Sequence, residues 1–234
     1  MSVEGGPNIV EAGLVFYVDP ANPRSYISGS LDTFDLINST VTGSLINDVS
    51  FSFNSWNFDG VDDSIDCNII TELNGAPNAT WSCWLKRLSP ISGYYTMGTW
   101  GNSGTDRQMV LFQTSTYIRI LIGDSTGYDT AFQCNLTADT DWHNVVITYD
   151  GSLSNILKVK VYYDGSPLTP NTATGTNVTN LNVSLNGFTI GKLGSGTPGV
   201  NDFNGNISNI PIYNVTLSQT EVLQNYNALK NRFK

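Results

Sequence analysis

Short stretches of alternating apolar and polar residues, separated by turn residues, recur along this chain of 234 residues. In the stretch 79–88, Trp81, Cys83 and Leu85 fall on one side of an extended backbone, whereas Trp84 falls on the other. Such alternation is typical of a strand with one face toward a core. Comparable stretches, bounded by Gly, Asn, Asp or Pro, are FSFNSWNF, YIRILIG, WHNVVITYDG, KVKVYYDG, NGFTIGKLG and GNISNIPIYN. The pattern predicts an all-β fold, an antiparallel two-sheet jelly-roll sandwich.

The C-terminal segment has helical spacing instead. Its apolar residues are Val222, Tyr226, Leu229 and Phe233. Ser218 and Glu221 precede this stripe and are three residues apart, which is the spacing of a capping box at the start of a helix. The pattern predicts a short C-terminal helix at about residues 219–231. We expect its apolar stripe to be buried against one end of the sandwich, and a partner-binding helix is the alternative.

Chain length and composition indicate one folded domain. The chain is 40% hydrophobic and 11% aromatic, which is enough to bury a core without disulfide or metal staples. Residues 1–8 are small and polar and predict a flexible N-terminal arm that becomes ordered only against another subunit. Residues 9–234 contain no domain-sized linker, and all-β domains often reach this size. We therefore expect a single domain over residues 9–234.

Charge and cysteine content narrow the choice of partners and compartment. The formal net charge of −9 repels phosphate backbones and anionic lipid heads at long range, so neither nucleic acid nor a membrane is expected as a partner. Cys67, Cys83 and Cys134 are odd in number and widely spaced, which argues against a disulfide framework and a zinc site. The N-terminal stretch lacks the basic region of a secretory signal. We expect folding in a reducing cytoplasm, with cysteines as small core residues.

Five segments, in order along the chain, resemble one known family. They are GLVFYVDPANPRSY, WNFDGVDDSIDC, ATWSCWLKRL, WHNVVITYDG with KVKVYYDG, and FNGNISNIPIYNVTLSQTEVLQNYNALKNRF. The chain is similar to the laminin-G-like, concanavalin A-like jelly-roll family. Its first and last segments resemble the members found in bacteriophage virion proteins, particularly those of marine phages. The resemblance spans about Gly13 to Phe233, and it implies two curved antiparallel sheets, often with a structural calcium ion and a sugar-binding concave face or rim.

The resemblance implies a non-enzymatic surface protein of a phage virion that acts by adhesion. It would be a capsid decoration or accessory protein, or a component of the tail or its fibres, assembled in the host cytoplasm. The expected partners are other virion proteins, host or environmental glycans, and further copies of the chain in a homo-oligomer. Because this fold hosts many functions, a carbohydrate-binding, lectin-like module is the alternative, and a glycoside hydrolase comes third.

The sequence predicts no catalytic residues. Glycosidases built on this fold commonly carry two glutamates on one strand. The glutamates of this chain are scattered: Glu4, Glu11, Glu72 and Glu221. The sole imidazole, His143, lies within a predicted strand and is interpreted as a packed or edge residue. A GxGxxG match at residues 194–199 contains Pro198 and precedes no predicted helix, so it is interpreted as a loop.

Carboxylates cluster in NFDGVDDSIDC, where they fit a turn at the end of a strand. Carboxylate oxygens are also the ligands that calcium prefers, so two interpretations stay open: a structural turn with solvated carboxylates, or a cation site completed by remote donors. The candidate ligands are Asp19, Asp59, Asp62, Asp63 and Asp202. Related modules often have acidic residues where this chain has Ser208 and Asn209, which weakens the calcium hypothesis. No cofactor is required in either case, and a bound Ca²⁺ would be structural.

Aromatic residues outside the predicted core are candidates for sugar binding. Sugars bind proteins by stacking on aromatic faces and by hydrogen bonding to polar groups. The candidates are Trp84, on the outward side of its strand, and Tyr94, Tyr95 and Trp100 in the stretch GYYTMGTWGNSG. Packing against neighbouring loops or a partner subunit is the alternative for each of them.

Overall fold

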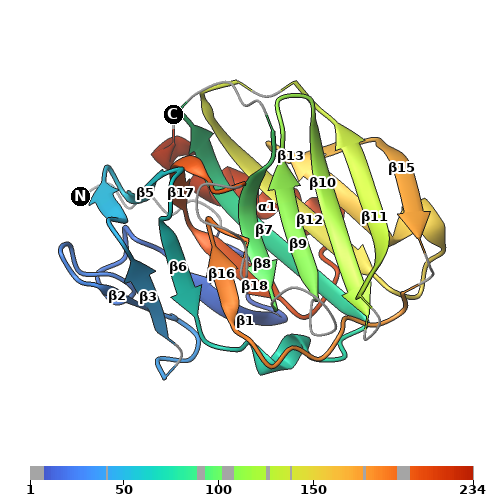
Figure 1. Cartoon of the computed structure of the whole chain (residues 1–234), viewed down its shortest axis with the longest axis horizontal. Helices are drawn as coiled ribbons and strands as arrows, with labels where there is room; N and C mark the ends of the chain where they lie inside the picture. Colours follow the sequence, from blue (N-terminus) through green and yellow to red (C-terminus); the bar gives the residue numbers. More distant parts are fainter. Residues whose placement is uncertain are drawn as a thin grey trace.

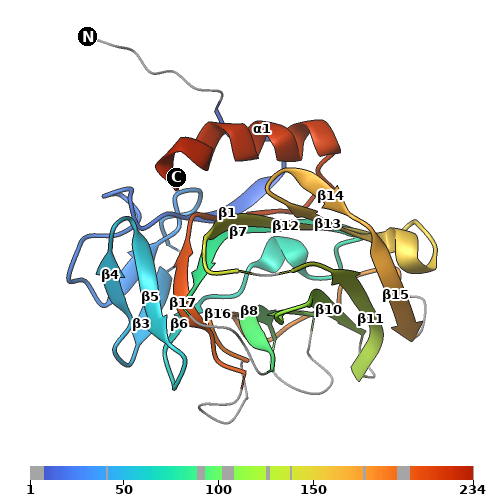
Figure 2. The same ribbon diagram turned by 90° about the horizontal axis from the view of Figure 1, so that it is seen from above.

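Two antiparallel sheets face each other across a common core (Figure 1, Figure 2). A computed structural model of the chain describes residues 8–40, 42–88, 93–101, 108–124, 127–137, 139–175, 178–193 and 201–233. Nearly all of the regular structure in these ranges is strand, and the one α-helix lies near the C-terminus. The predicted all-β, two-sheet antiparallel sandwich with a short C-terminal helix is confirmed.

Sheet A has the strand order β14-β13-β12-β7-β17-β5-β4, and β18 pairs with both β7 and β1. Its strands are β1 (Leu14–Val18), β4 (Ser50–Ser52), β5 (Ser55–Asp59), β7 (Asn78–Arg87), β12 (Trp142–Asp150), β13 (Val159–Tyr163), β14 (Ser166–Leu168), β17 (Asn204–Ser208) and β18 (Ile210–Tyr213). The long β7 lies beside β12, so the two stretches with the clearest alternation are direct neighbours.

Sheet B has the strand order β15-β11-β10-β9-β8-β16-β6-β3-β2. Its strands are β2 (Asp32–Phe34), β3 (Thr42–Ile46), β6 (Ser64–Cys67), β8 (Tyr95–Trp100), β9 (Met109–Gln113), β10 (Tyr117–Asp124), β11 (Gly127–Asn135), β15 (Pro170–Gly175) and β16 (Phe188–Ile190). Three short 3₁₀ turns complete the described structure: η1 (Thr71–Leu73), η2 (Asn155–Lys158) and η3 (Lys230–Arg232). Strands that are close in sequence, such as β8 to β11, run side by side and form a continuous surface.

The inward side chains of both sheets share one hydrophobic core. On β7, Trp81 and Leu85 are buried in it, as the alternation of that stretch predicts. Trp100 of β8 stacks on Phe188 of β16 with 4.3 Å between ring centroids, and it meets Trp81 edge-on at 6.4 Å. Because Trp81 belongs to sheet A and the other two rings to sheet B, these contacts join the sheets.

The C-terminal helix α1 (Gln219–Leu229), continued by η3, lies across the outer face of sheet A (Figure 2). The predicted capping box forms: Ser218 Oγ accepts the Glu221 amide at 3.4 Å, and the Glu221 carboxylate accepts the Ser218 amide at 2.7 Å. Hydrogen bonding with Ser218 lowers the pKa of Glu221. The N-terminal end of α1 is therefore fixed by the residues that the sequence indicated.

Aromatic stacking and an ion pair attach the last turn to sheet A. The ring of Trp84, on the outer face of β7, is stacked on Phe233 at 4.4 Å and on Tyr226 at 5.6 Å. The Arg232 guanidinium donates to both carboxylate oxygens of Asp19 at 2.5 and 2.7 Å. The apolar stripe of α1 is packed against the sandwich as expected, but on the outer face of sheet A and not at one end.

The first residues that the structure describes pack against α1. The Asn8 carbonyl accepts a hydrogen bond from Gln224 Nε2 at 2.8 Å. The Val10 amide donates to Asn225 Oδ1 at 2.8 Å, and the buried Val10 side chain belongs to the cluster beneath the helix. Residues 1–7 of the predicted flexible arm lie outside the described residues. Asn8, the last residue of that predicted arm, is already part of the packed structure.

The three cysteines are free and buried, as expected. Burial raises the pKa of the Cys134 thiol to about 11 and raises that of Cys67 and Cys83 further, so the thiols stay protonated at neutral pH. Within the described ranges, the helices are too short or too polar to span a membrane.

Candidate functional site

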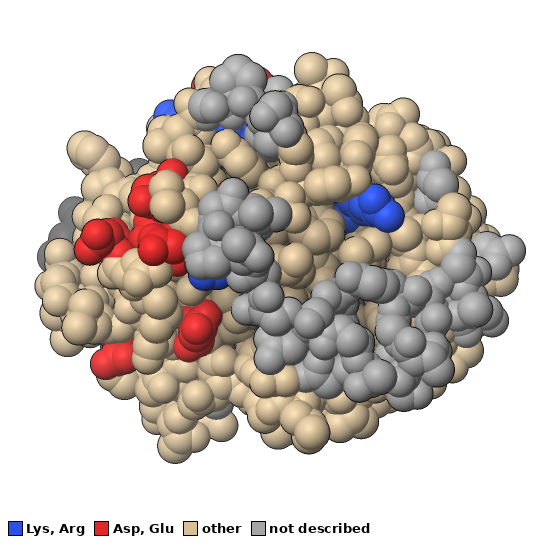
Figure 3. Space-filling view, in the orientation of Figure 1, with Lys and Arg blue, Asp and Glu red and all other residues tan. Residues whose placement is uncertain are grey.

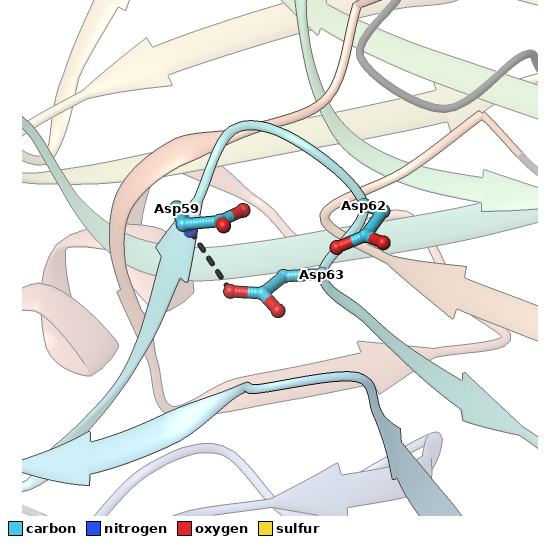
Figure 4. A group of neighbouring side chains, drawn as sticks. All are labelled: Asp59, Asp62 and Asp63. Carbon is cyan, nitrogen blue, oxygen red and sulfur yellow. Dashed lines mark hydrogen bonds between the residues drawn. The ribbon is translucent and has the colours of Figure 1, made fainter.

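Three carboxylates, which we call the turn carboxylates, gather between β5 and β6: Asp59, Asp62 and Asp63 (Figure 4). One oxygen from each lies within 4.8 Å of the others. Asp63, only 2% exposed, accepts the Asp59 amide at 2.9 Å on one oxygen and the Asp48 amide at 3.1 Å on the other. Asp59 in turn accepts the Val61 amide at 2.7 Å. These bonds give the carboxylates a role in shaping the turn.

The residues of this turn account for its backbone conformation and for the pKa of Asp63. Gly60 has a φ of +79°, a conformation that favours glycine. Burial raises the pKa of Asp63, although the amides of Asp59 and Asp48 act in the opposite direction. Calcium takes about six to eight oxygens, so the turn carboxylates fit its donor preference and would supply part of a coordination shell.

The structure does not add the two remote candidates to the turn carboxylates. Asp19 is 8% exposed at its side chain and is paired with Arg232, and it also accepts Asn209 Nδ2 at 3.1 Å. Asp202 is buried before β17 and is outside the acidic group found among the described residues. Asp19 is thus outside the group of turn carboxylates, and the Arg232 guanidinium compensates its charge. The sequence missed this pairing because Arg232 is distant along the chain.

Two of the four predicted sugar-binding residues have no open face. Trp84 is 3% exposed because Phe233 and Tyr226 cover it. Trp100 is 4% exposed because it lies inside the sandwich against Phe188. Neither ring is a platform for a sugar in this structure. Trp84 packs against the C-terminal helical segment and Trp100 packs in the core, so neither packs against a loop or a partner subunit, which was the alternative. Alternation along β7 identifies the outward side of the strand, but it does not show that α1 covers Trp84.

The other two predicted residues, Tyr94 and Tyr95, are half-buried on sheet B. The Tyr95 ring packs at 5.8 Å from Phe203. The Tyr94 ring packs at 5.1 Å from Phe112, and its hydroxyl oxygen accepts hydrogen bonds from the Tyr117 hydroxyl at 3.2 Å and from Arg119 Nη1 at 2.9 Å. Of the four candidates, Tyr94 is thus the one at the centre of a partly exposed polar cluster.

Tyr94, Tyr117 and Arg119 form what we call the tyrosine–arginine cluster. The Arg119 guanidinium carbon lies 5.8 Å from the centroid of the Tyr94 ring. The hydrogen bond from Tyr117, opposed by burial and assisted by Arg119, lowers the pKa of Tyr94. An open hollow of about 510 Å³ is lined by Thr116, which precedes Tyr117, by Asn135, which is its cross-strand partner, and by Leu136 and Thr137. Aromatic rings, hydroxyls and a guanidinium beside a hollow can bind a polar ligand with apolar faces.

Sequence reasoning did not single out Tyr117 and Arg119, although a signal for them exists. The stretch YIRILIG alternates, so Ile118 and Ile120 face the core while Tyr117 and Arg119 face outward. What the alternation does not contain is the distance to Tyr94, which precedes β8, two strands away in the sheet. The cluster depends on that long-range contact.

The sequence match that decides the family is extensive. The profile Laminin_G_3, described as the concanavalin A-like lectin/glucanases superfamily, matches residues 59–223. The chain belongs to this superfamily. The match runs from the turn carboxylates to α1, and it confirms the family and the jelly-roll fold that the five sequence segments indicated. A search of curated proteins found no match to this laminin-G-like domain.

Several solved structures are similar to the laminin-G-like domain, and three of them are described with a bound sugar or with a sugar-containing partner. A Trypanosoma rangeli sialidase in complex with 2,3-difluoro-KDN superposes with a TM-score of 0.70 at 18% identity, covering 99% of this chain and 35% of the sialidase chain. The binding domain of botulinum neurotoxin DC in complex with SialylT gives 0.68 at 13%, covering 93% and 52%. A botulinum neurotoxin type C structure, described as depending on two ganglioside molecules for cell entry, gives 0.68 at 12%, covering 93% and 51%.

These similarities establish the fold of the laminin-G-like domain. The chain spans about a third of the sialidase and about half of the neurotoxin chains, and the identities are low. The chemistry of this domain therefore has to be argued from its own residues.

The described glutamates do not form a glycosidase pair. Glu11 precedes β1, Glu72 lies on η1 and Glu221 caps α1, so they belong to three separate elements. Glu4 and the GxGxxG stretch at residues 194–199 lie outside the described residues. Within the described strands, the laminin-G-like domain lacks the two glutamates on one strand that hydrolysis on this fold commonly uses.

His143 has a structural environment. Its Nδ1 lies 2.7 Å from Asp164 and its Nε2 lies 2.8 Å from Asp139, while its ring stacks on Tyr163 at 4.4 Å. Burial lowers the pKa of His143, but hydrogen bonds and charges of Asp164 and Asp139 outweigh burial and raise the pKa overall. With both ring nitrogens engaged, His143 links two loops to β12 and is not arranged as a general base.

Proposed function

We propose that the laminin-G-like domain is a non-enzymatic carbohydrate-binding module that acts by adhesion. The observation that carries the proposal is the tyrosine–arginine cluster, in which two phenol rings and a guanidinium lie together on the partly exposed face of sheet B. Aromatic faces stack on the apolar faces of sugar rings, and the polar groups bond sugar oxygens. Membership of a lectin-containing superfamily and the sugar-bound structural neighbours support the same class.

A glycan array followed by titration of the best-bound sugars tests this proposal. Tyr94→Ala removes the ring at the centre of the cluster and is expected to weaken binding at least tenfold, by about 1.4 kcal/mol or more. Phe53→Ala is the matched control, because it removes a strongly exposed ring from the distant β4–β5 turn. Equal loss of binding in both variants, or no binding to any glycan, would refute the proposal.

The absence of bond cleavage and of a required cofactor is part of the same proposal. The support is the distribution of glutamates over separate elements and the amide hydrogen bonds to the turn carboxylates. Incubation with a glycan panel, in calcium or in chelator, should release no reducing sugar. Sugar release that is lost in Asp63→Asn would instead identify a hydrolase centred on the turn.

A phage virion is the proposed setting of this module, as a capsid decoration or accessory protein or as part of the tail or its fibres. The support is the resemblance of the first and last sequence segments to phage virion proteins. There the module would contact other virion proteins and further copies of itself, and the glycans would be those of the host or the environment. Quantitative mass spectrometry of purified particles tests this setting, since a fixed copy number is expected and absence from the particles would refute it.

A further inference from the structure

The tyrosine–arginine cluster is matched to one chemical class of sugar. We infer that it selects saccharides that carry a carboxylate, such as those with a sialic or a uronic acid. This inference rests on the proposed carbohydrate-binding function and specifies its ligand. Three observations support it: the direction of the hydrogen bonds, the absence of a described anion beside Arg119, and the uncharged neighbours of Arg119.

The hydrogen bonds found within the cluster leave donors unused. The Tyr94 oxygen accepts from Tyr117 and from Arg119, so the Tyr94 proton is not used inside the cluster. A guanidinium has several N–H donors in a planar fork, and the bond to Tyr94 uses one of them. A phenol that accepts two bonds, one of them from a cation, is also a stronger donor. The cluster therefore presents donors, and its natural complement is a group rich in acceptors.

Arg119 has no acidic partner among the described residues. The ion pairs found there involve His143 and Arg232, and none includes Arg119. Its cross-strand neighbours in the register of sheet B are Phe112 on β9 and Gln133 on β11, which are uncharged. In a chain of net charge −9, a half-buried guanidinium without a carboxylate beside it is open to an external anion.

The surrounding surface separates this cation from the acidic residues. Figure 3 shows an exposed group of Lys or Arg atoms where β10 and β11 lie in Figure 1, and the described residues around this group are neither acidic nor basic. Arg119 lies on β10. The exposed carboxylates of this view gather toward β3 and β6. An anionic ligand at β10 therefore meets attraction at short range.

A sugar carboxylate satisfies the donors of the cluster together. Its two oxygens accept parallel N–H bonds from the guanidinium fork, which are stronger than bonds between neutral groups, and a further lone pair accepts the Tyr94 proton. The half-buried ring of Tyr117 offers an apolar contact for the sugar ring. A neutral sugar leaves the guanidinium charge unmatched and so binds less tightly.

Titration of the whole chain with matched acidic and neutral sugars tests the inference. The probes are 3′-sialyllactose against lactose, and an oligogalacturonate against its methyl ester. The first pair reports on sialic acid and the second on uronic acid. The variants are Arg119→Gln, which removes the charge, Arg119→Lys, which keeps charge but not the fork, and Tyr94→Phe, which removes only the hydroxyl. Lys160→Gln on the exposed side of β13 is the control, because it changes net charge equally on sheet A.

We expect at least one acidic sugar to bind about tenfold or more tightly than its neutral counterpart. Arg119→Gln should abolish this preference, Arg119→Lys and Tyr94→Phe should reduce it, and Lys160→Gln should leave it unchanged. Equal binding of acidic and neutral sugars overturns the inference while the proposed function stands. A preference that persists in Arg119→Gln overturns the assignment to this cluster, and failure to bind any glycan overturns the proposed function itself. Circular dichroism verifies that each variant is folded. If both Arg119 variants unfold, the inference is tested with Tyr94→Phe, which should reduce the preference for the acidic sugar.

Discussion

At the scale of single residues, polar groups at strand ends hold together segments that are far apart in the sequence. His143 at the start of β12 bonds Asp139 on one side and Asp164 on the other. Because ionised carboxylates only accept hydrogen bonds, this geometry favours the protonated imidazole, in which both ring nitrogens donate. The second oxygen of Asp164 accepts the Asn144 amide at 2.9 Å. Protonated His143 thus helps to fix the β13–β14 turn. This turn lies close to α1, since a Cβ added at Gly165 would lie 3.1 Å from a side-chain atom of Leu223.

The protonation of His143 should make folding stability depend on pH. The pKa of His143 is raised in the folded chain, where the two carboxylates outweigh burial, so the folded state binds the proton more tightly than the unfolded state. Its contribution is complete below the ordinary pKa of about 6.5 and is lost as pH rises through the folded-state value. We expect the free energy of unfolding of the parent to exceed that of His143→Gln at pH 6, by on the order of 1 kcal/mol, and the difference to shrink by pH 9. A difference that grows with pH in urea titrations would contradict the charged form.

Asp63 and Asp62 should differ in their effect on stability although they are adjacent. An asparagine in place of Asp63 would keep only one acceptor oxygen for two amides, so Asp63→Asn should lower the free energy of unfolding by about 1–3 kcal/mol, even in chelator. Asp62 is half-buried and its side chain makes no hydrogen bond within the described chain, so Asp62→Asn should change little. Melting in calcium and in chelator provides the measurement. An ion bound only to the folded chain would stabilise it by about 2.7 kcal/mol at a hundredfold excess, so a calcium shift abolished by Asp62→Asn would establish a cation site instead of a turn.

At the scale of elements, the C-terminal helix shows which features local spacing can predict. Ser218 and Glu221 are three residues apart, and the reciprocal bonds of a capping box need only that spacing, so the start of α1 was predictable. The stripe of the helix was predictable for the same reason. Its partner Trp84 was not, because helical spacing identifies which side is buried but not the strand it meets. The burial of Trp84 and the pairing of Arg232 with Asp19 are both consequences of that docking.

Capping and docking should contribute unequally to the stability of this element. Ser218→Ala removes the acceptor for one amide and should cost about 1 kcal/mol. Phe233→Ala removes a buried ring stacked on Trp84 and should cost about 3 kcal/mol. Urea denaturation of both variants measures the difference. Equal and negligible effects would show that α1 is not docked in solution, and α1 would then be a candidate for binding a partner.

At the scale of the whole molecule, the fold was more predictable than the site. Alternation along each strand is local, and a buried face on every strand is enough to indicate two sheets packed on one core. The tyrosine–arginine cluster depends instead on β8 to β10 lying side by side, which places Tyr94 next to Tyr117 and Arg119. The turn carboxylates were found because they are close in sequence, whereas the pairing of Asp19 with Arg232 was missed because these two residues are far apart in sequence. Groups of side chains that are close in sequence can thus be predicted from the sequence. Groups that the strand order brings together can be found only from the structure.

The same topology predicts that the sandwich and the helix unfold as one unit. The cluster beneath α1 consists of Val10, Val146, Tyr162, Tyr213, Leu217 and Val222. Val146, Tyr162 and Tyr213 are the outward residues of β12, β13 and β18, whose inward neighbours lie in the main core. Loss of that core therefore removes the surface on which α1 is docked, and loss of α1 exposes large apolar groups on sheet A.

Tryptophan fluorescence can separate the two regions and so test this cooperativity. Trp56, Trp81 and Trp100 lie in the core, whereas Trp84 and Trp142 lie against Phe233, at 4.4 and 5.0 Å between ring centroids. The variant with both Trp84→Phe and Trp142→Phe reports on the core alone. In urea, each protein should show one transition whose midpoint is the same by fluorescence and by far-UV circular dichroism, as two-state unfolding requires. A fluorescence transition at lower urea that is present in the parent and missing in the double variant would mean that α1 detaches first, and the single unit would be refuted.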